Sequence, residues 1–210
     1  MKRIVYLFVS FLPMCVNYII IRMSIIISFI VNAYIDKYIT DGDFSLSRKD
    51  LSKIISESFK KTNITGLIVG SLISILIFIT WFMKIRKNAE TKTRLKFSVL
   101  IAALVYGAAC QAFLHLVLDK SYAGQSIGIT VLLIFTGVIN EQILLRAITM
   151  HYSCMASSSF LVANIIQAFI IACLQPNLLQ GVCAFVLGFF MGIIFDKAGE
   201  GGLQHYSMYT

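Results

Sequence analysis

Charged residues are scarce in this chain, and their scarcity excludes an ordinary soluble domain. Only 13% of the 210 residues are Asp, Glu, Lys or Arg, whereas 58% are hydrophobic. The mean hydropathy is +0.84. Soluble domains are about one quarter charged and about half apolar. Because the charges separate long apolar blocks, the pattern is typical of a polytopic α-helical membrane protein.

Proline, paired cysteines and acidic residues are scarce as well. No linker rich in Pro, Gly or Ser divides the chain, so a single bundle is expected. The five cysteines contain no Cys-x-x-Cys spacing, which argues against a disulfide framework. Eighteen basic and ten acidic residues give a net charge of +8. The basic residues flank apolar blocks without interleaved aromatics, so nucleic acid is not an expected partner.

The apolar blocks predict an all-α membrane bundle of about six transmembrane helices. The spans are expected within residues 4–35, 64–83, 97–118, 127–150, 160–174 and 179–195. The first block suits one bent helix of about 48 Å, and a tight hairpin is the alternative. No small-residue cleavage site follows its basic start, so we interpret it as a retained anchor.

The segments between spans predict organisation and topology. Residues 36–63 are polar, with apolar side chains near helical spacing at Leu46, Leu51, Ile54, Ile55 and Phe59. This spacing indicates a short amphipathic helix on the membrane surface, or else a solvated helix over the bundle end. Residues 84–96 hold six Lys or Arg and one Glu, which predicts a cytoplasmic loop. The chain then divides into N-terminal membrane helices, 1–96, and a membrane core, 97–210.

Two glycine pairs are spaced four residues apart within predicted spans. They are Gly66 with Gly70 and Gly188 with Gly192. Small residues at this spacing let neighbouring membrane helices approach closely, so both pairs are expected at helix contacts.

A carboxylate and a guanidinium interrupt the fourth predicted span at residues 141–146, Glu-Gln-Ile-Leu-Leu-Arg. Each charge costs roughly 2.5–3.5 kcal/mol at that depth, so both must face protein or water. Gln142 and Arg146 are four residues apart and share a helix face, with Glu141 offset by about 100°. We expect Gln142 and Arg146 to contact each other, Glu141 to face a cavity, and Arg146 to depend on Glu141 for its counter-charge.

Residues 141–146 resemble the Glu-Glu-x-x-x-Arg motif of the CAAX-protease and bacteriocin-processing family of membrane metalloproteases. Residues 169–173, Phe-Ile-Ile-Ala-Cys, stand where the family has its second motif, Phe-x-x-x-His, and residues 205–209 stand where it has its third, His-x-x-x-Asn or His-x-x-x-Asp. The stretch around Asn164 and the glycine-bearing helix after it are also similar. The resemblance spans about residues 97 to 205.

The resemblance implies roles for individual residues, although the match is incomplete. Glu141, Gln142 and Arg146 would form the catalytic centre, but Gln142 stands where the family has a second Glu. Phe169, Cys173 and Asn164 would bind substrate, but Cys173 replaces the motif histidine and Tyr209 replaces Asn or Asp. A zinc ion would have Glu141, Cys173 and His205 as ligands, with His115 as a further donor.

The departures favour a catalytically impaired relative in the bacterial inner membrane. The resemblance implies a part in bacteriocin or microcin self-immunity, maturation or export. Its partners would be membrane lipids, a peptide or bacteriocin precursor, and an export apparatus. Three alternatives remain open: an active zinc metallo-endopeptidase with altered ligands, a transporter or channel subunit in which Glu141 and Arg146 line a path, and a purely structural subunit. Whether Thr210 is the native end is open too.

Overall fold

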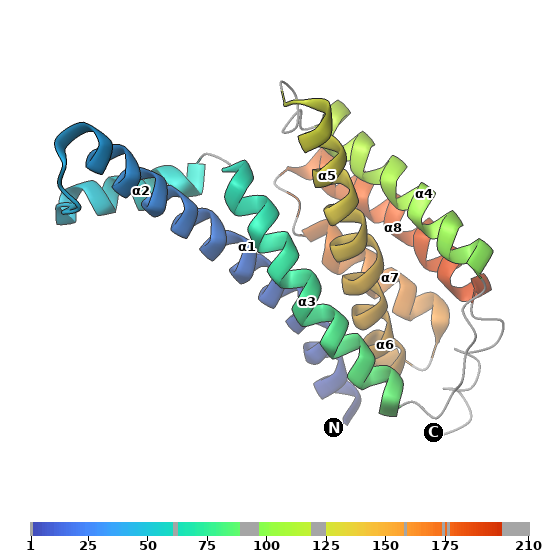
Figure 1. Ribbon diagram of the computed structural model, residues 1–210. Helices are drawn as coiled ribbons and strands as arrows, with labels where there is room; N and C mark the ends of the chain where they lie inside the picture. The colour runs from blue at the N-terminus through green and yellow to red at the C-terminus, as the bar shows by residue number, and fades with distance from the viewer. Residues whose placement is uncertain are drawn as a thin grey trace. The chain divides into compact units, whose positions relative to one another are not determined.

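The computed structural model describes residues 2–60, 63–88, 97–118, 125–157, 159–173, 175 and 177–198. Every regular element within these residues is a helix (Figure 1), which confirms the predicted all-α class. The chain forms two compact units, one of residues 1–15 with 75–210 and the other of residues 16–74. Helices α1 (Lys2–Asp41) and α3 (Ile64–Asn88) contribute to both units.

Helix α1 decides between the two interpretations of the first apolar block. It continues for 40 residues through Pro13, so the prediction of one long helix is confirmed and the hairpin is excluded. At 1.5 Å per residue it is about 60 Å long, roughly twice the hydrocarbon thickness of a bilayer. Gly42 follows with φ +67°, and its N–H donates to the Tyr38 carbonyl at 2.9 Å. Glycine takes this left-handed capping conformation without strain.

In the smaller unit, α3 approaches α1 through the first glycine pair, as the spacing predicted. A Cβ atom on Gly66 would lie 2.6 Å from the Cα of Ile25, and one on Gly70 would lie 3.0 Å from the Cα of Ile21. These neighbours are backbone atoms, which cannot rotate away as a side chain can. The contact therefore requires glycine at position 66 above all.

Two side-chain hydrogen bonds flank this glycine contact and fix its register. Ser28 Oγ donates to Asn63 Oδ1 at 3.2 Å, and Ser74 Oγ donates to Asn17 Oδ1 at 2.6 Å. Residue numbers rise along α3 as those of their partners fall along α1, so the two helices are antiparallel. Apolar helices are commonly joined in this way by serine and asparagine side chains.

Helix α2 (Arg48–Lys60) confirms the predicted helix between the first two spans. A capping box begins it, because the Asp50 N–H donates to Ser47 Oγ at 3.2 Å and the Ser47 N–H donates back to Asp50 Oδ2 at 3.2 Å. On its inner side Ser58 is buried and Leu51 is half-buried. The helix thus has one side turned into its unit and one side free.

The larger unit contains the remaining predicted spans. Helix α4 (Phe97–Ala112) continues as the π-helix η1 (Phe113–Leu118). Helix α5 (Ile127–Gly137), the π-helix η2 (Val138–Leu145) and α6 (Arg146–Ser157) follow one another without a break. Helix α7 (Phe160–Cys173) packs on α6 and on α8 (Leu178–Ala198), and α4 packs on α8 and η2. Most of the predicted cytoplasmic loop, residues 89–96, lies outside the described residues.

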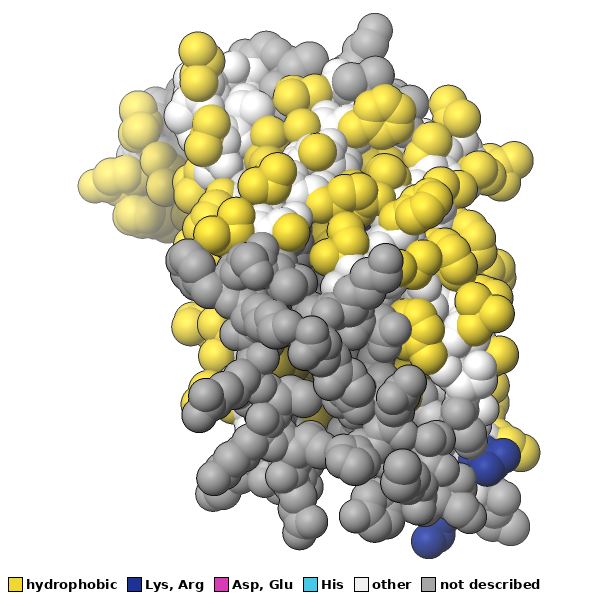
Figure 2. Space-filling model, turned by 90° about the vertical axis from the view of Figure 1, so that its right-hand side faces the viewer, with side chains coloured by type: hydrophobic (Ala, Val, Ile, Leu, Met, Phe, Trp, Pro, Cys, Tyr) yellow, Lys and Arg dark blue, Asp and Glu magenta, His cyan; other side chains and the backbone are white. Residues whose placement is uncertain are grey.

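Length and composition suit three of these helices to crossing a membrane. They are Lys2–Asp41, Ile64–Ile85 and Ile127–Ser157, and two shorter apolar helices are Phe160–Cys173 and Leu178–Ile194. Large hydrophobic side chains are exposed along them, including Leu76 at 66% and Phe190 at 53%. Figure 2 shows a face on which hydrophobic side chains cover most of the described surface. Exposed apolar surface on this scale, together with the long apolar helices, suggests a membrane protein.

The glycine contact gives a test of the α1–α3 packing. Gly66→Ala is expected to lower the free energy of unfolding by about 1–3 kcal/mol, because its Cβ meets the Ile25 backbone. Gly128→Ala in α5 is the matched control, since nothing lies within 4 Å of its new Cβ. That substitution should leave stability unchanged or raise it by up to about 1 kcal/mol through helix propensity. Thermal unfolding in detergent measures both, and equal midpoints would contradict the close contact.

Candidate functional site

The charged motif lies at a local change of helix geometry. Residues Val138–Leu145 are π-helical between α5 and α6, so Glu141 and Gln142 fall inside η2 and Arg146 opens α6. A π-helical turn inside an α-helix carries an extra residue per turn and is often found at functional sites. The sequence did not reveal this π-helical turn. The predicted directions of Glu141, Gln142 and Arg146 therefore assumed an ordinary α-helix.

Arg146 is a fully buried cation whose hydrogen bonds go to amide groups. Its side chain is 2% exposed. Its Nε donates to Gln142 Oε1 at 2.8 Å, and its Nη1 donates to Gln167 Oε1 at 3.1 Å. The expected contact between Gln142 and Arg146 is therefore confirmed. Both acceptors are neutral, so the positive charge is stabilised by oriented dipoles.

Gln167 and Asn164 extend this arrangement from α7 to α8. Gln167 Nε2 donates to Asn164 Oδ1 at 2.8 Å and to the Gly188 carbonyl at 3.0 Å. Asn164 Nδ2 donates to the Phe189 carbonyl at 2.9 Å. Both side chains are at most 1% exposed. We call Gln142, Arg146, Asn164 and Gln167 the amide network; it joins η2, α6, α7 and α8.

The second glycine pair makes room for this network. A Cβ on Gly188 would lie 2.2 Å from Arg146 Nη1, and a Cβ on Gly192 would lie 1.8 Å from Asn164 Oδ1. Real Cβ atoms do not come so close to other heavy atoms, so either substitution would displace a member of the network. The pair was predicted to bring helices together. Its observed role is more specific, because it admits polar side chains between α7 and α8.

Glu141 makes no direct hydrogen bond to Arg146, although its negative charge lies near enough to favour the charged guanidinium. The half-buried carboxylate instead accepts a hydrogen bond from Gln111 Nε2 of α4 at 3.0 Å. A π-helical turn lies between the two side chains, and their hydrogen bonds run to different partners. Glu141 faces α4, whereas Arg146 faces α7 and α8.

Two polar contributors were missed by the sequence reasoning. Gln111 is 1% exposed, and its Oε1 has no hydrogen-bond partner among the described residues. Gln167 carries three of the network's hydrogen bonds. A signal was present in both cases, namely an amide within an otherwise apolar helix, and Gln167 is also three residues from Asn164. Without the structure, nothing tied either amide to Glu141 or Arg146.

Phe169 and Cys173 lie apart from the network. Phe169 is 55% exposed and Cys173 is exposed as well. Cys173 is nine residues after Asn164, which places it on the opposite side of α7, about 180° away. Of the residues expected to bind substrate, Asn164 is therefore in the amide network and the other two are not.

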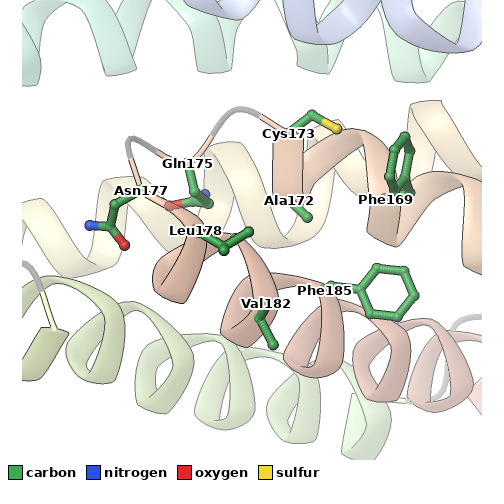
Figure 3. Close-up of a pocket in the computed structure, with 9 residues that line it drawn as sticks. Phe169, Ala172, Cys173, Gln175, Asn177, Leu178, Val182 and Phe185 are labelled. Atoms are coloured by element: carbon green, nitrogen blue, oxygen red, sulfur yellow. The ribbon is translucent and has the colours of Figure 1, made fainter.

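Phe169 and Cys173 line an open groove where α7 ends and α8 begins (Figure 3). The groove has a volume of about 500 Å³, and its other lining residues include Gln175, Leu178, Val182 and Phe185. Its walls are mainly apolar, with the Gln175 and Asn177 amides near the connection between the helices. The expected cavity around both Glu141 and Cys173 is thus replaced by two separate places, a packed polar network and an apolar groove.

The described residues do not assemble the expected zinc ligands. No group of three or more His, Cys, Asp or Glu side chains within metal-binding reach occurs in this part of the chain. Glu141 is hydrogen bonded to α4, whereas Cys173 faces the groove. His205 and the side chain of His115 lie outside the described residues. Within the described residues Glu141 and Cys173 have different surroundings, and the zinc site that the resemblance implies stays a prediction.

Comparison with known proteins supplies no relative. No family model, no curated protein and no solved structure matches the chain. The resemblance to the CAAX-protease and bacteriocin-processing family accordingly rests on the motifs at residues 141–146, 169–173 and 205–209.

Gln167→Leu tests the energetic importance of the amide network. It removes an acceptor from the buried guanidinium of Arg146 and a donor from two oxygens, so we expect a loss of roughly 3–5 kcal/mol in unfolding free energy. Phe169→Leu on the exposed side of α7 is the control and should cost less than about 1 kcal/mol. Thermal unfolding in detergent distinguishes them. A smaller loss for Gln167→Leu than for Phe169→Leu would contradict the network.

Proposed function

We propose that the chain is a multi-pass protein of the bacterial inner membrane with about six spans and both ends in the cytoplasm. Three long and two shorter apolar helices support this proposal, and α4 with η1 supplies a further apolar segment. With the amino terminus inside, Lys2, Arg3, residues 84–96 and Arg146 all fall toward the cytoplasmic side. These residues agree with the positive-inside rule, whereas residues 36–63, with six Lys or Arg and five Asp or Glu, fall on the opposite side.

We further propose that it is a non-hydrolytic relative of the CAAX-protease and bacteriocin-processing family. The observation that carries this is the hydrogen bond from Arg146 Nε to Gln142 Oε1 at 2.8 Å. A glutamine at the position of the family's second Glu cannot take up a proton from water, because a neutral amide is not a base. Metal-assisted hydrolysis needs a metal or base that activates water. The amide network holds its helices by hydrogen bonding instead.

The ligand that we propose is a peptide segment bound in the groove between α7 and α8. Apolar walls from Phe169, Leu178, Val182 and Phe185 suit hydrophobic side chains, and the nearby amides suit a peptide backbone. Two of the lining residues, Phe169 and Cys173, are those for which the resemblance implied substrate contact. On the same resemblance, the peptide is a bacteriocin or microcin precursor, and binding serves self-immunity, maturation or export.

The amide network and the groove are connected through α7 and α8. Gln167 and Asn164 bond to α8 carbonyls, and a Cβ on Gly181 would lie 3.2 Å from the Ala172 carbonyl oxygen at the groove. These contacts join the two helices that form the groove walls. Because α7 and α8 are already joined, they would lose little conformational entropy when a peptide binds in the groove. A small entropy cost supports the proposed binding of a peptide.

Absence of hydrolysis is the first test of this proposal. The purified full chain is expected to contain no stoichiometric zinc and to leave a bacteriocin precursor peptide uncut. Elemental analysis and mass spectrometry of the incubated peptide measure these two quantities. About one zinc per chain that is lost in Glu141→Ala, together with cleavage, would favour the active metallo-endopeptidase instead.

Thiol labelling tests the groove as the binding place. A variant that keeps Cys173 and has its other four cysteines replaced by serine should react with a maleimide, because Cys173 is exposed. Bound peptide should slow that reaction several-fold by covering the thiol. The matched variant that keeps only Cys15, which is exposed on α1, should react at one rate with and without peptide. Peptide binding without protection of Cys173 would place the ligand elsewhere.

A further inference from the structure

Helix α2 presents a mixed basic and apolar surface on its free side. The exposed residues on this side are Arg48, Lys49, Ser52, Lys53, Ile55, Ser56 and Phe59, which we call the α2 face; Asp50 is exposed as well, on another side. Ile55 is 38% exposed and Phe59 is 56% exposed. At about 100° per residue, all seven side chains fall within an arc of about 160°. The helix therefore concentrates apolar and basic groups on one side.

The acidic residues of α2 lie outside this arc. Asp50 and Glu57 are about 120–140° from its centre. Asp50 is engaged in the capping box with Ser47, whose hydrogen bonds hold the pKa of that carboxyl below its ordinary value. The Asp50 carboxylate is therefore held at the first turn of α2 by Ser47, and it points away from the α2 face. The surface that remains is positive with an apolar strip.

The two serines of the α2 face separate the apolar strip from the lysines. Ser52 Oγ donates to the Lys49 carbonyl and Ser56 Oγ donates to the Lys53 carbonyl, each at 2.8 Å. Because each hydroxyl already donates its hydrogen bond within the helix, neither needs a donor contact with water. Apolar groups beside long basic side chains are what an amphipathic helix uses to bind a lipid surface.

The fold places α2 at the end of two apolar helices. Ser28 of α1 is paired with Asn63 at the start of α3, and α1 continues beyond that point to Asp41. The 13 residues of α2 span about 20 Å on the way back to α3. The connection therefore leaves α1 about 20 Å beyond Ser28 and returns to α3 at Ile64, so the end of α2 that carries Ile55 and Phe59 lies nearest the level at which α3 would enter the bilayer.

We propose that the α2 face binds anionic phospholipid headgroups, with Ile55 and Phe59 inserted between the lipids. Complementary charge is the reason for anionic lipid, since Arg48, Lys49 and Lys53 attract its phosphates. This inference rests on the membrane placement proposed above. It does not depend on the peptide ligand or on the chemistry of Glu141.

Quenching of tryptophan by brominated lipid tests the inference in the full chain. The native Trp81 is replaced by Phe, and a single reporter is introduced as Phe59→Trp in one variant and as Leu76→Trp in another. Leu76 lies on α3 and is 66% exposed, so it reports the span itself. Both variants are placed in nanodiscs of dibrominated phosphatidylcholine, with or without about one third phosphatidylglycerol. The double variant Lys49→Gln/Lys53→Gln removes two positive charges from the α2 face. Its control is the double variant Lys2→Gln/Arg3→Gln, which removes two positive charges from the opposite end of α1.

We expect the Phe59→Trp emission to be quenched more strongly when phosphatidylglycerol is present. Lys49→Gln/Lys53→Gln should weaken this docking about 30-fold, from ~1 kcal/mol per basic residue near an anionic surface, and Lys2→Gln/Arg3→Gln should not change it. Quenching at Leu76→Trp without quenching at Phe59→Trp would overturn the inference alone. Quenching of Phe59→Trp that ignores phosphatidylglycerol or the lysines would also overturn it. Absence of quenching at both positions would overturn the membrane placement itself.

Discussion

The burial of the Arg146 guanidinium is the constraint on which the larger unit depends. A charge away from water requires hydrogen-bond partners, and leaving a buried donor without one costs about 1–3 kcal/mol, or more when the donor is charged. Here the partners are the Gln142 and Gln167 amides, and Gln167 is held in turn by Asn164 and by the Gly188 carbonyl. The guanidinium thereby determines which faces of η2, α7 and α8 must meet.

The same constraint explains the glycines and the position of the groove. Because Arg146 and Asn164 occupy the space above Gly188 and Gly192, α8 must present bare backbone there. Near the other end of the contact, Gly181 of α8 lies close to the Ala172 carbonyl, and the apolar groove opens beside it. The amide network and the apolar groove thus lie on the same pair of helices, α7 and α8. The network joins the two helices, and the groove opens near the connection between them. This arrangement suits the proposed binding of a peptide without cleavage.

Much of the helix arrangement could be predicted, and less of the site. The long α1, the helix at α2 and the close packing at Gly66 followed from apolar runs, helical spacing and small residues. The Gln142–Arg146 contact followed from a spacing of four. Glu141 and Arg146 make no direct contact, because each is hydrogen bonded to amide side chains instead, on either side of a π-helical turn that the sequence did not reveal. Gln111 and Gln167 were missed because single amides in apolar helices do not reveal which neighbour they face.

Composition and periodicity by themselves determined that this chain is helical, where its long apolar helices lie and which of its charges must be sheltered, because burial and helix geometry act locally along the chain. Only the tertiary structure decided that Glu141 is hydrogen bonded to Gln111 while Arg146 is bonded to Gln167, and that Cys173 lies apart from both. Partners more than twenty residues away depend on how helices rotate and pack against one another. That rotation is set jointly by all contacts of a bundle, so no single segment encodes it.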